Sequence, residues 1–484
     1  MNINTLKHKE CFIFPYSNTT VILKNYLLKN NIRFNGFIDS FQKGKDISTT
    51  EDIKSIYFDY IFILSQNHFQ AIYKELIKTI KKEKIILVNT NNFTSKYSFI
   101  HNVDTFIHTY NNQEKELEDY FNKNLLSYKL KDEILLIGIG FIDLNIKYLY
   151  LYLKKYSNLK VHLATDNLRD IEIFKEYSID VVYYQSKEFL ELVFRTKVKI
   201  IDHTPVDKLL VKSLQIGKSI QLWHGITIET LGVLANYKII KYDIVLSTSK
   251  FVSEYSFSKI FDSKKIIHCG YPRNDVLHID NIELLNIDKS LLNQMKSKEF
   301  KYIVYMPTHR PLSFEDNPID YITLNKFAKE NNIKFIIKMH PFVAEKYRDD
   351  LSSHQNSDYV YTHLIMYPPY MDIYPILKYS DMLISDYSSV YFDYLYVDKP
   401  ILFFCYDYEE WAKGEQGVIL DYFKHSPGDK CYNLDELLKN ILKNLEKDSY
   451  KEERKVIFDK MFENQNKEST TLIYNKIKIL LVTK

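Results

Sequence analysis

Two histidines follow short apolar segments that have the pattern of β-strands. In a parallel sheet, ligands bind at the carboxyl ends of the strands, which is where these histidines would lie. His224 follows residues 219–223. His340 follows residues 334–338 and precedes Pro341, which restricts the backbone of the histidine to extended conformations. Histidine is the usual general base near neutral pH, so both residues are candidates for proton transfer. Each also fits a structural histidine at a strand end or in a turn.

Residues suited to an anion follow two other apolar segments. Arg310 comes after residues 302–306, and its planar guanidinium can bind phosphate oxygens in pairs, although a surface ion pair fits equally well. Asp386, Ser388 and Ser389 lie between an apolar strand pattern and a helical pattern. A strand, a hydroxyl-rich turn and a helix present backbone N–H groups to an anion, but the same residues also fit a well-capped helix without a ligand.

These candidates together suit a pyrophosphate substrate. The acidic residues show no clustering with metal-ligand spacing, so we expect no metal and no other cofactor, with cations and protein dipoles stabilising the charge instead. The four cysteines are far apart and form no CxxC pair, which indicates neither a zinc site nor a disulfide framework. This cysteine usage favours a reduced, cytoplasmic protein.

Short apolar runs alternate with helical patterns along the chain, which predicts parallel sheets with βαβ crossovers. We expect three domains: an accessory Rossmann-like α/β domain at residues 1–125, an acceptor-side domain at 126–290 and a donor-binding domain at 291–484. The first strand is not followed by a GxGxxG motif, so a dinucleotide site there is unsupported. The expected fold is α/β: a GT-B-like pair of Rossmann-type domains facing a cleft, after a small N-terminal α/β domain.

The composition excludes several classes of protein. Lysine plus arginine exceed aspartate plus glutamate by 65 − 62 = 3, which does not call for a nucleic-acid partner. The first ten residues are polar and no apolar run reaches 18 residues, so we expect neither a signal peptide nor a transmembrane helix. Residues 146–156 are aromatic with interspersed lysines; a helix facing a core is favoured over one lying on a membrane surface.

Five motifs in order resemble the CDP-glycerol glycerophosphotransferase family of teichoic acid primases and polymerases. They are Trp-His-Gly-x-Thr at 223–227, Pro-Thr-x-Arg at 307–310, Lys-Met-His-Pro at 338–341, Ile-Ser-Asp-Tyr-Ser-Ser-Val-x-Phe-Asp-Tyr at 384–394 and Lys-Pro-Ile-Leu-Phe-Phe-x-Tyr-Asp at 399–407. The similarity covers residues 130 to 480. It implies a GT-B fold and the transfer of a polyol phosphate from a CDP-activated donor to a hydroxyl, with release of CMP.

The resemblance also implies roles for individual residues. His224 and His340 are the catalytic histidines, with His224 as the general base and His340 facing the donor pyrophosphate. The residues implied in binding the donor phosphates or CDP are Thr308, Arg310, Asp386, Ser388 and Ser389, with Asp386 mainly orienting its turn. Those on the acceptor side are Gly225, Thr227 and Glu229. Glu229 stands near a position where lysine is common in the family, so the acceptor contacts carry over least directly.

The expected function is synthesis of a capsule or teichoic-acid-type polymer on a lipid-linked or polysaccharide acceptor. Glycerol or ribitol phosphate can be the transferred group, and single addition and polymerisation both remain open. The expected location is cytoplasmic, peripheral at the inner face of the cell membrane. A GT-B glycosyltransferase that uses a nucleotide sugar is the alternative, and a non-catalytic CDP-polyol-binding module is the least favoured hypothesis because both histidines stand in their motifs.

Overall fold

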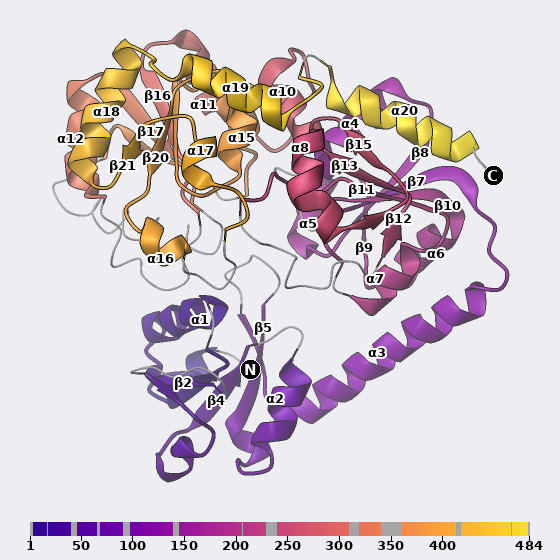
Figure 1. The fold of residues 1–484 in the computed structure, drawn as a ribbon. Helices are drawn as coiled ribbons and strands as arrows, with labels where there is room; N and C mark the ends of the chain where they lie inside the picture. The colour runs from indigo at the N-terminus through magenta and orange to yellow at the C-terminus, as the bar shows by residue number, and fades with distance from the viewer. Residues whose placement is uncertain are drawn as a thin grey trace. The chain divides into compact units, whose positions relative to one another are not determined.

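The computed structural model describes most of the chain, and Figure 1 shows its ribbon. The described residues are 3–16, 18–39, 46–64, 68–90, 97–138, 145–205, 207–228, 240–308, 319–339, 361–368, 370–412, 418–465 and 467–482. The chain divides into two compact units, here called unit 1, Met1–Phe121, and unit 2, the described residues from Asn122 onward. Unit 1 contains one large sheet and unit 2 contains two.

Unit 1 is a doubly wound sheet with the strand order β3-β2-β1-β4-β5-β6, in which only β6 is antiparallel to its neighbour. Successive residues of its strands face opposite sides, so Phe12 and Ile61 join one core and Cys11 and Phe62 another. The strands are β1 Glu10–Phe14, β2 Arg33–Ile38, β3 Ile47–Ser48, β4 Tyr60–Ile63, β5 Ile85–Thr90 and β6 Tyr97–Ile100, and the α-helices are α1 Asn18–Lys29, α2 Phe69–Leu76 and α3 Val103–Asn124.

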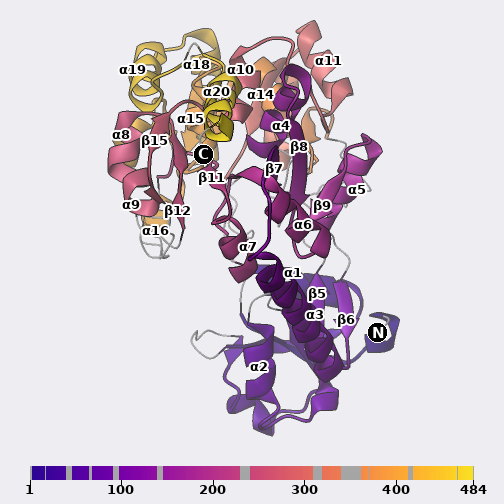
Figure 2. The same cartoon turned by 90° about the vertical axis from the view of Figure 1, so that its right-hand side faces the viewer.

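The first sheet of unit 2 has seven parallel strands in the order β15-β13-β11-β10-β7-β8-β9. Helices α5 and α6 lie beside β9, as Figure 2 shows. The strands are β7 Lys131–Gly138, β8 Lys160–Thr165, β9 Val181–Tyr183, β10 Thr196–Ile201, β11 Lys218–Gln221, β13 Ile244–Ser247 and β15 Ile266–His268, and the helices are α4 Asn145–Tyr156, α5 Leu168–Glu176, α6 Lys187–Arg195 and α7 Lys208–Ser213. Shorter elements follow β11: β12 Lys241–Tyr242, α8 Lys250–Val252, α9 Ser258–Ile260, β14 Asp262–Ser263, a 3₁₀ turn at Pro272–Asn274 and α10 Asp275–His278.

The second sheet of unit 2 has six parallel strands in the order β18-β17-β16-β19-β20-β21. Its central strands are buried apolar runs, as expected for a sheet covered on both faces. The strands are β16 Lys301–Tyr305, β17 Ile333–Ile337, β18 Leu364–Met366, β19 Met382–Ser385, β20 Ile401–Phe404 and β21 Lys430–Cys431, and the helices are α11 Lys289–Ser297, α12 Tyr321–Glu330, α14 Tyr374–Tyr379, α15 Val390–Tyr394, α16 Tyr408–Ala412, α17 Tyr422–His425, α18 Leu434–Glu446 and α19 Lys451–Met461.

The last helix, α20 (Ser469–Val482), returns to the seven-stranded sheet. Its apolar residues Ile473 and Ile477 belong to the same buried core as Ile134 of β7. The buried carboxylate of Asp275 accepts hydrogen bonds from the first two backbone N–H groups of α20, at 2.8 and 2.9 Å. The prediction of a domain at 291–484 did not include this return of α20 to the seven-stranded sheet.

Helix α4 faces a protein core, as preferred from its sequence. Ile146, Leu149 and Leu153 lie on one side of it and are fully buried in the core of the seven-stranded sheet. Across the described part of the chain, no helix combines the length and the apolar character needed to cross a membrane.

We predict that Lys199→Met stabilises the protein. Lys199 lies in β10 and is fully buried, its Nζ donates a hydrogen bond to the Thr196 carbonyl at 2.6 Å, and burial lowers the pKa of Lys199 to about 7. The unfolded chain holds this proton up to about pH 10.4, so the stability of the native protein falls as the pH drops from that value towards 7. The methionine variant has no such dependence, and its gain of about 1–4 kcal/mol should be largest near pH 7.

The measurement is the midpoint of thermal unfolding at about pH 7 and about pH 9.5. The control is Lys160→Met, at an exposed position on β8, which is separated from β10 by β7 in the same sheet. An equal gain at both pH values, or none, would contradict a buried lysine with a lowered pKa.

Candidate functional site

Two of the sequence motifs, one from each sheet of unit 2, meet at a glycine. Gly225 follows β11, and Ser389 follows β19. A Cβ atom on Gly225 would lie only 2.7 Å from Ser389 Oγ and 3.3 Å from Ser389 Cβ, so a larger residue does not fit without displacing the serine. The predicted base His224 and the predicted phosphate-binding Ser389 are therefore brought to one place.

His224 is held in the form that a general base requires. Its Nδ1 lies 2.8 Å from the backbone carbonyl oxygen of Asp202, which can only accept, so Nδ1 carries the proton and Nε2 has the lone pair. Burial lowers the pKa of His224, and the charges of Arg273 and His203 act in the same direction, while the Asp202 contact opposes them. A neutral imidazole with Nε2 as its acceptor suits removal of a proton from a hydroxyl.

The backbone turns sharply before His224. The strand pattern predicted β structure through Trp223, but β11 ends at Gln221 and Trp223 has a left-handed φ of 56°. Two hydrogen bonds hold this turn: Asn145 Nδ2 donates to the Trp223 carbonyl at 2.5 Å, and the Trp223 N–H donates to Gln221 Oε1 at 2.9 Å. The Trp223 ring also packs on the imidazole with centroids 4.2 Å apart, so the orientation of His224 is fixed from both sides.

Asp386 ties the end of β16 to the end of β19. Its carboxylate accepts hydrogen bonds from the Thr308 N–H at 2.8 Å, the Thr308 hydroxyl at 2.6 Å and the Tyr387 N–H at 2.6 Å. Asp386 is almost completely buried. These contacts match the turn-orienting role expected for Asp386. Binding of donor phosphate by Asp386 or Thr308 stays a prediction.

The serines lie where α15 begins. Ser388 Oγ accepts a hydrogen bond from the Val390 N–H at 3.4 Å, whereas Ser389, the residue before the helix, makes no side-chain capping bond. Helix α15 has only five residues, so its dipole is small. The expectation that these serines bind phosphate therefore rests on their hydroxyls and the neighbouring N–H groups more than on the helix.

Of the other predicted site residues, the structure describes Thr227 and Gly225 but not Arg310, His340 or Glu229. Thr227 is buried, and its Oγ1 lies 2.7 Å from Ser256 Oγ, so its hydroxyl already has a protein partner. Its role on the acceptor side stays a prediction, as does that of Gly225.

A buried ion pair next to the site escaped the sequence reasoning. Arg273 Nη2 and Nε donate to Asp393 Oδ2 at 2.7 and 3.2 Å, and the Tyr374 hydroxyl donates to the same oxygen at 2.7 Å. Neither Arg273 nor Asp393 is among the site residues predicted from the sequence. Asp202 was also missed, although it directly follows β10, which ends at Ile201.

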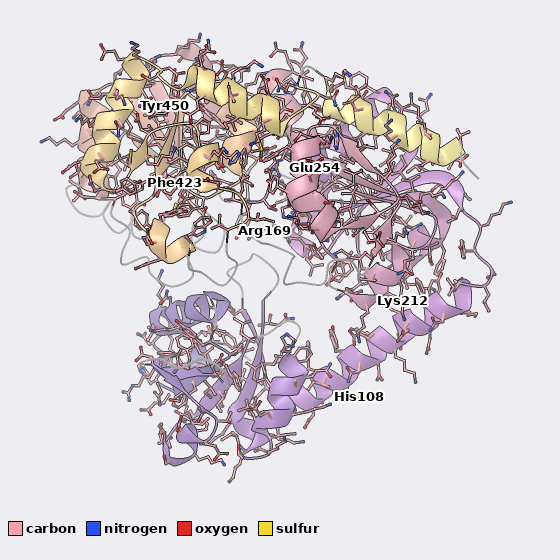
Figure 3. The ribbon with its side chains drawn as sticks, viewed as in Figure 1. His108, Arg169, Lys212, Glu254, Phe423 and Tyr450 are labelled. Carbon is pink, nitrogen blue, oxygen red and sulfur yellow. The ribbon has the colours of Figure 1, made fainter. Side chains whose placement is uncertain are left out.

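Further contacts join the regions of the two sheets. The Arg169 guanidinium at the start of α5 lies over the Tyr370 ring, 3.4 Å from its centroid, and Figure 3 labels this arginine. The buried Lys147 of α4 forms an ion pair with Asp372. Within the described ranges no group of three His, Cys, Asp or Glu side chains can hold a metal ion, and the expectation of a reaction without a metal stays a prediction.

We predict that Gly225→Ala destabilises the protein by about 1–3 kcal/mol, because its methyl group collides with Ser389 Oγ. Adding Ser389→Ala removes that oxygen and should restore much of the loss. The measurement is thermal unfolding of the single and double variants, since it does not depend on activity. Ser388→Ala combined with Gly225→Ala is the matched control. Equal recovery with either serine variant would contradict the contact.

Comparison with known proteins agrees with this arrangement. The family described as CDP-Glycerol:Poly(glycerophosphate) glycerophosphotransferase matches residues 122–478. The teichoic acid poly(glycerol phosphate) polymerase of Bacillus subtilis (strain 168) is 32% identical over 250 residues, 46% of this chain and 32% of the relative. The corresponding polymerase of Staphylococcus epidermidis is 28% identical over 364 residues, 68% of this chain and 47% of the relative. The chain thus spans about a third to a half of the length of these polymerases.

The solved structure of the wall teichoic acid polymerase TagF is similar to this chain, with a TM-score of 0.58 and 24% identity, over 78% of this chain and 98% of that chain. This likeness confirms the expected fold class, a GT-B-like pair of Rossmann-type domains with a further small α/β domain. The family match covers well over half of the 484 residues. The chain belongs to the CDP-glycerol:poly(glycerophosphate) glycerophosphotransferase family.

Proposed function

We propose that this protein transfers a polyol phosphate from a CDP-activated donor to a hydroxyl group and releases CMP. The observation that carries the proposal is the position of His224, whose Nδ1 is bound to a carbonyl and whose neighbour Gly225 packs on Ser389. A base with an available Nε2 beside a hydroxyl-rich turn suits a reaction in which a hydroxyl attacks a phosphorus atom.

In the proposed reaction, His224 Nε2 takes the proton of the acceptor hydroxyl. The oxygen then attacks the phosphorus that bears the polyol, and the bond from that phosphorus to the bridging oxygen of CMP breaks. Ser388, Ser389, Arg310 and His340 bind the donor pyrophosphate and stabilise the charge on the departing CMP. Positioning and charge stabilisation carry most of the catalysis in phosphoryl transfer, so the proposal assigns no step to a metal.

For the acceptor, we propose a lipid-linked or polysaccharide hydroxyl of a teichoic-acid or capsule-type polymer, reached from the cytoplasm at the inner face of the membrane. The support is the family match and the names of the similar polymerases. Glycerol phosphate is the first group to test because the family description names CDP-glycerol. The family match begins at residue 122, so unit 1 lies outside the part of the chain that supports this proposal.

We predict that His224→Gln reduces CMP release from a CDP-polyol by at least about 100-fold, because glutamine keeps a polar side chain but cannot accept the proton. His340→Ala should have a loss of similar size. The assay measures CMP from CDP-glycerol in the presence of an acceptor. The matched control is His108→Gln, since His108 is exposed on α3 in unit 1 (Figure 3). Turnover near the normal rate in both site variants would contradict the mechanism.

A donor panel tests the substrate class separately. The proposal predicts that CDP-glycerol or CDP-ribitol is consumed and that CMP is the nucleotide product. A glycosyltransferase would instead consume a nucleotide sugar and usually leave a nucleoside diphosphate. A module that only binds would retain the CDP-polyol without turnover. Either of these two outcomes would overturn the proposed reaction.

A further inference from the structure

Arg273 connects the two segments of the candidate site, the one that carries Gly225 and the one that carries Ser389. It lies in the short turn after β15, whereas its partner Asp393 lies in α15, one helical turn after Ser389. The side chains of Arg273 and Asp393 are only 5% and 1% exposed. The Tyr374 hydroxyl completes the set of donors to the same carboxylate oxygen.

The guanidinium also lies next to the glycine at which the motifs meet. A methyl group on Gly225 would lie 3.7 Å from Arg273 Nη2 and 2.7 Å from Ser389 Oγ. The Arg273 N–H donates to Asn145 Oδ1 at 3.3 Å, and Asn145 Nδ2 in turn holds the Trp223 carbonyl. The backbone of Arg273 is therefore linked through Asn145 to Trp223, and its side chain lies next to Gly225, so both contact the surroundings of His224.

The charge of Arg273 acts on the same histidine. Among the described residues, the charged or titratable groups that bear on His224 are Asp202, His203 and Arg273. The positive charge of Arg273 disfavours protonation of the His224 imidazole and so lowers its pKa. Asp393 is the anion that offsets the charge of Arg273. A structural ion pair alone is weak evidence for a stabilising role, because burying two charges costs about as much as their attraction returns.

We propose that Arg273, anchored by Asp393, is a positioning residue for the transfer: it holds the Gly225 segment, and with it His224, against Ser389 and places a positive charge beside this histidine. This inference rests on the proposed function for its catalytic meaning. Its electrostatic part can be tested on the free protein without any substrate.

The test follows the His224 ring by NMR in the full chain labelled at histidine carbon, with His224→Gln for assignment. Arg273→Met should raise the pKa of His224 by about 0.5 or more, because a nearby positive charge is lost. Asp393→Asn should lower it, because the charge of Arg273 is no longer offset. Opposite directions for the two partners of one ion pair are the signature of an electrostatic role. A purely structural pair would leave the titration unchanged or move it in the same direction in both variants, and either result overturns the proposal.

Kinetics supply the second measurement. Arg273→Met should reduce kcat for CMP release by about tenfold or more while the KM for the donor stays within about threefold. The matched control is Arg454→Met, which removes another buried arginine, paired with Asp448 and Asp398, and should change neither the His224 titration nor kcat. If Arg273→Met does not fold, Asp393→Asn decides alone: an unchanged or raised pKa of His224 overturns the proposal.

The two proposals can fail separately. Absence of CMP release from every CDP-polyol by the unmodified protein would refute the proposed function and leave the titration result standing. Normal CMP release with no opposite shifts of the His224 titration would refute the role of Arg273 and leave the proposed function standing.

Discussion

The candidate site depends on the absence of a side chain at Gly225. Ser389 lies in the space that a Cβ atom on residue 225 would need, so the segments that follow β11 and β19 approach closely although these strands belong to different sheets. The predicted general base His224 and the hydroxyl-rich turn are then neighbours before any ligand is present. Catalysis gains from such prior arrangement, since the groups lose little freedom when the substrate binds.

Buried charge pairs accompany this close approach. Arg273 pairs with Asp393, and Lys147 pairs with Asp372, and each pair joins a residue from the region of the seven-stranded sheet to one from the region of the six-stranded sheet. Burying an ion pair often adds little net stability, but its geometry is exacting and an unpaired partner is costly. We infer that these pairs determine the relative orientation of the two regions more than they contribute to the stability of their contact.

Much of the fold class was predictable because parallel strands are buried apolar runs and their alternation with helices indicates βαβ crossovers. The resemblance also implied that Asp386 orients its turn, and the hydrogen bonds of this carboxylate agree with that role. The Arg273–Asp393 pair was not predicted, because its partners are 120 residues apart and Arg273 stands outside the five motifs. The left-handed Trp223 and the return of α20 were missed for a similar reason: both depend on partners distant in sequence.

We infer that a bound donor meets the candidate base His224 at the Gly225–Ser389 contact. A crystal structure of His224→Gln with bound CDP-glycerol tests it most directly. We predict that the pyrophosphate lies within hydrogen-bonding distance of the Ser388 or Ser389 hydroxyl, with the glycerol-bearing phosphorus facing residue 224. A nucleotide bound in unit 1, or at a strand edge away from Ser389, would contradict the account.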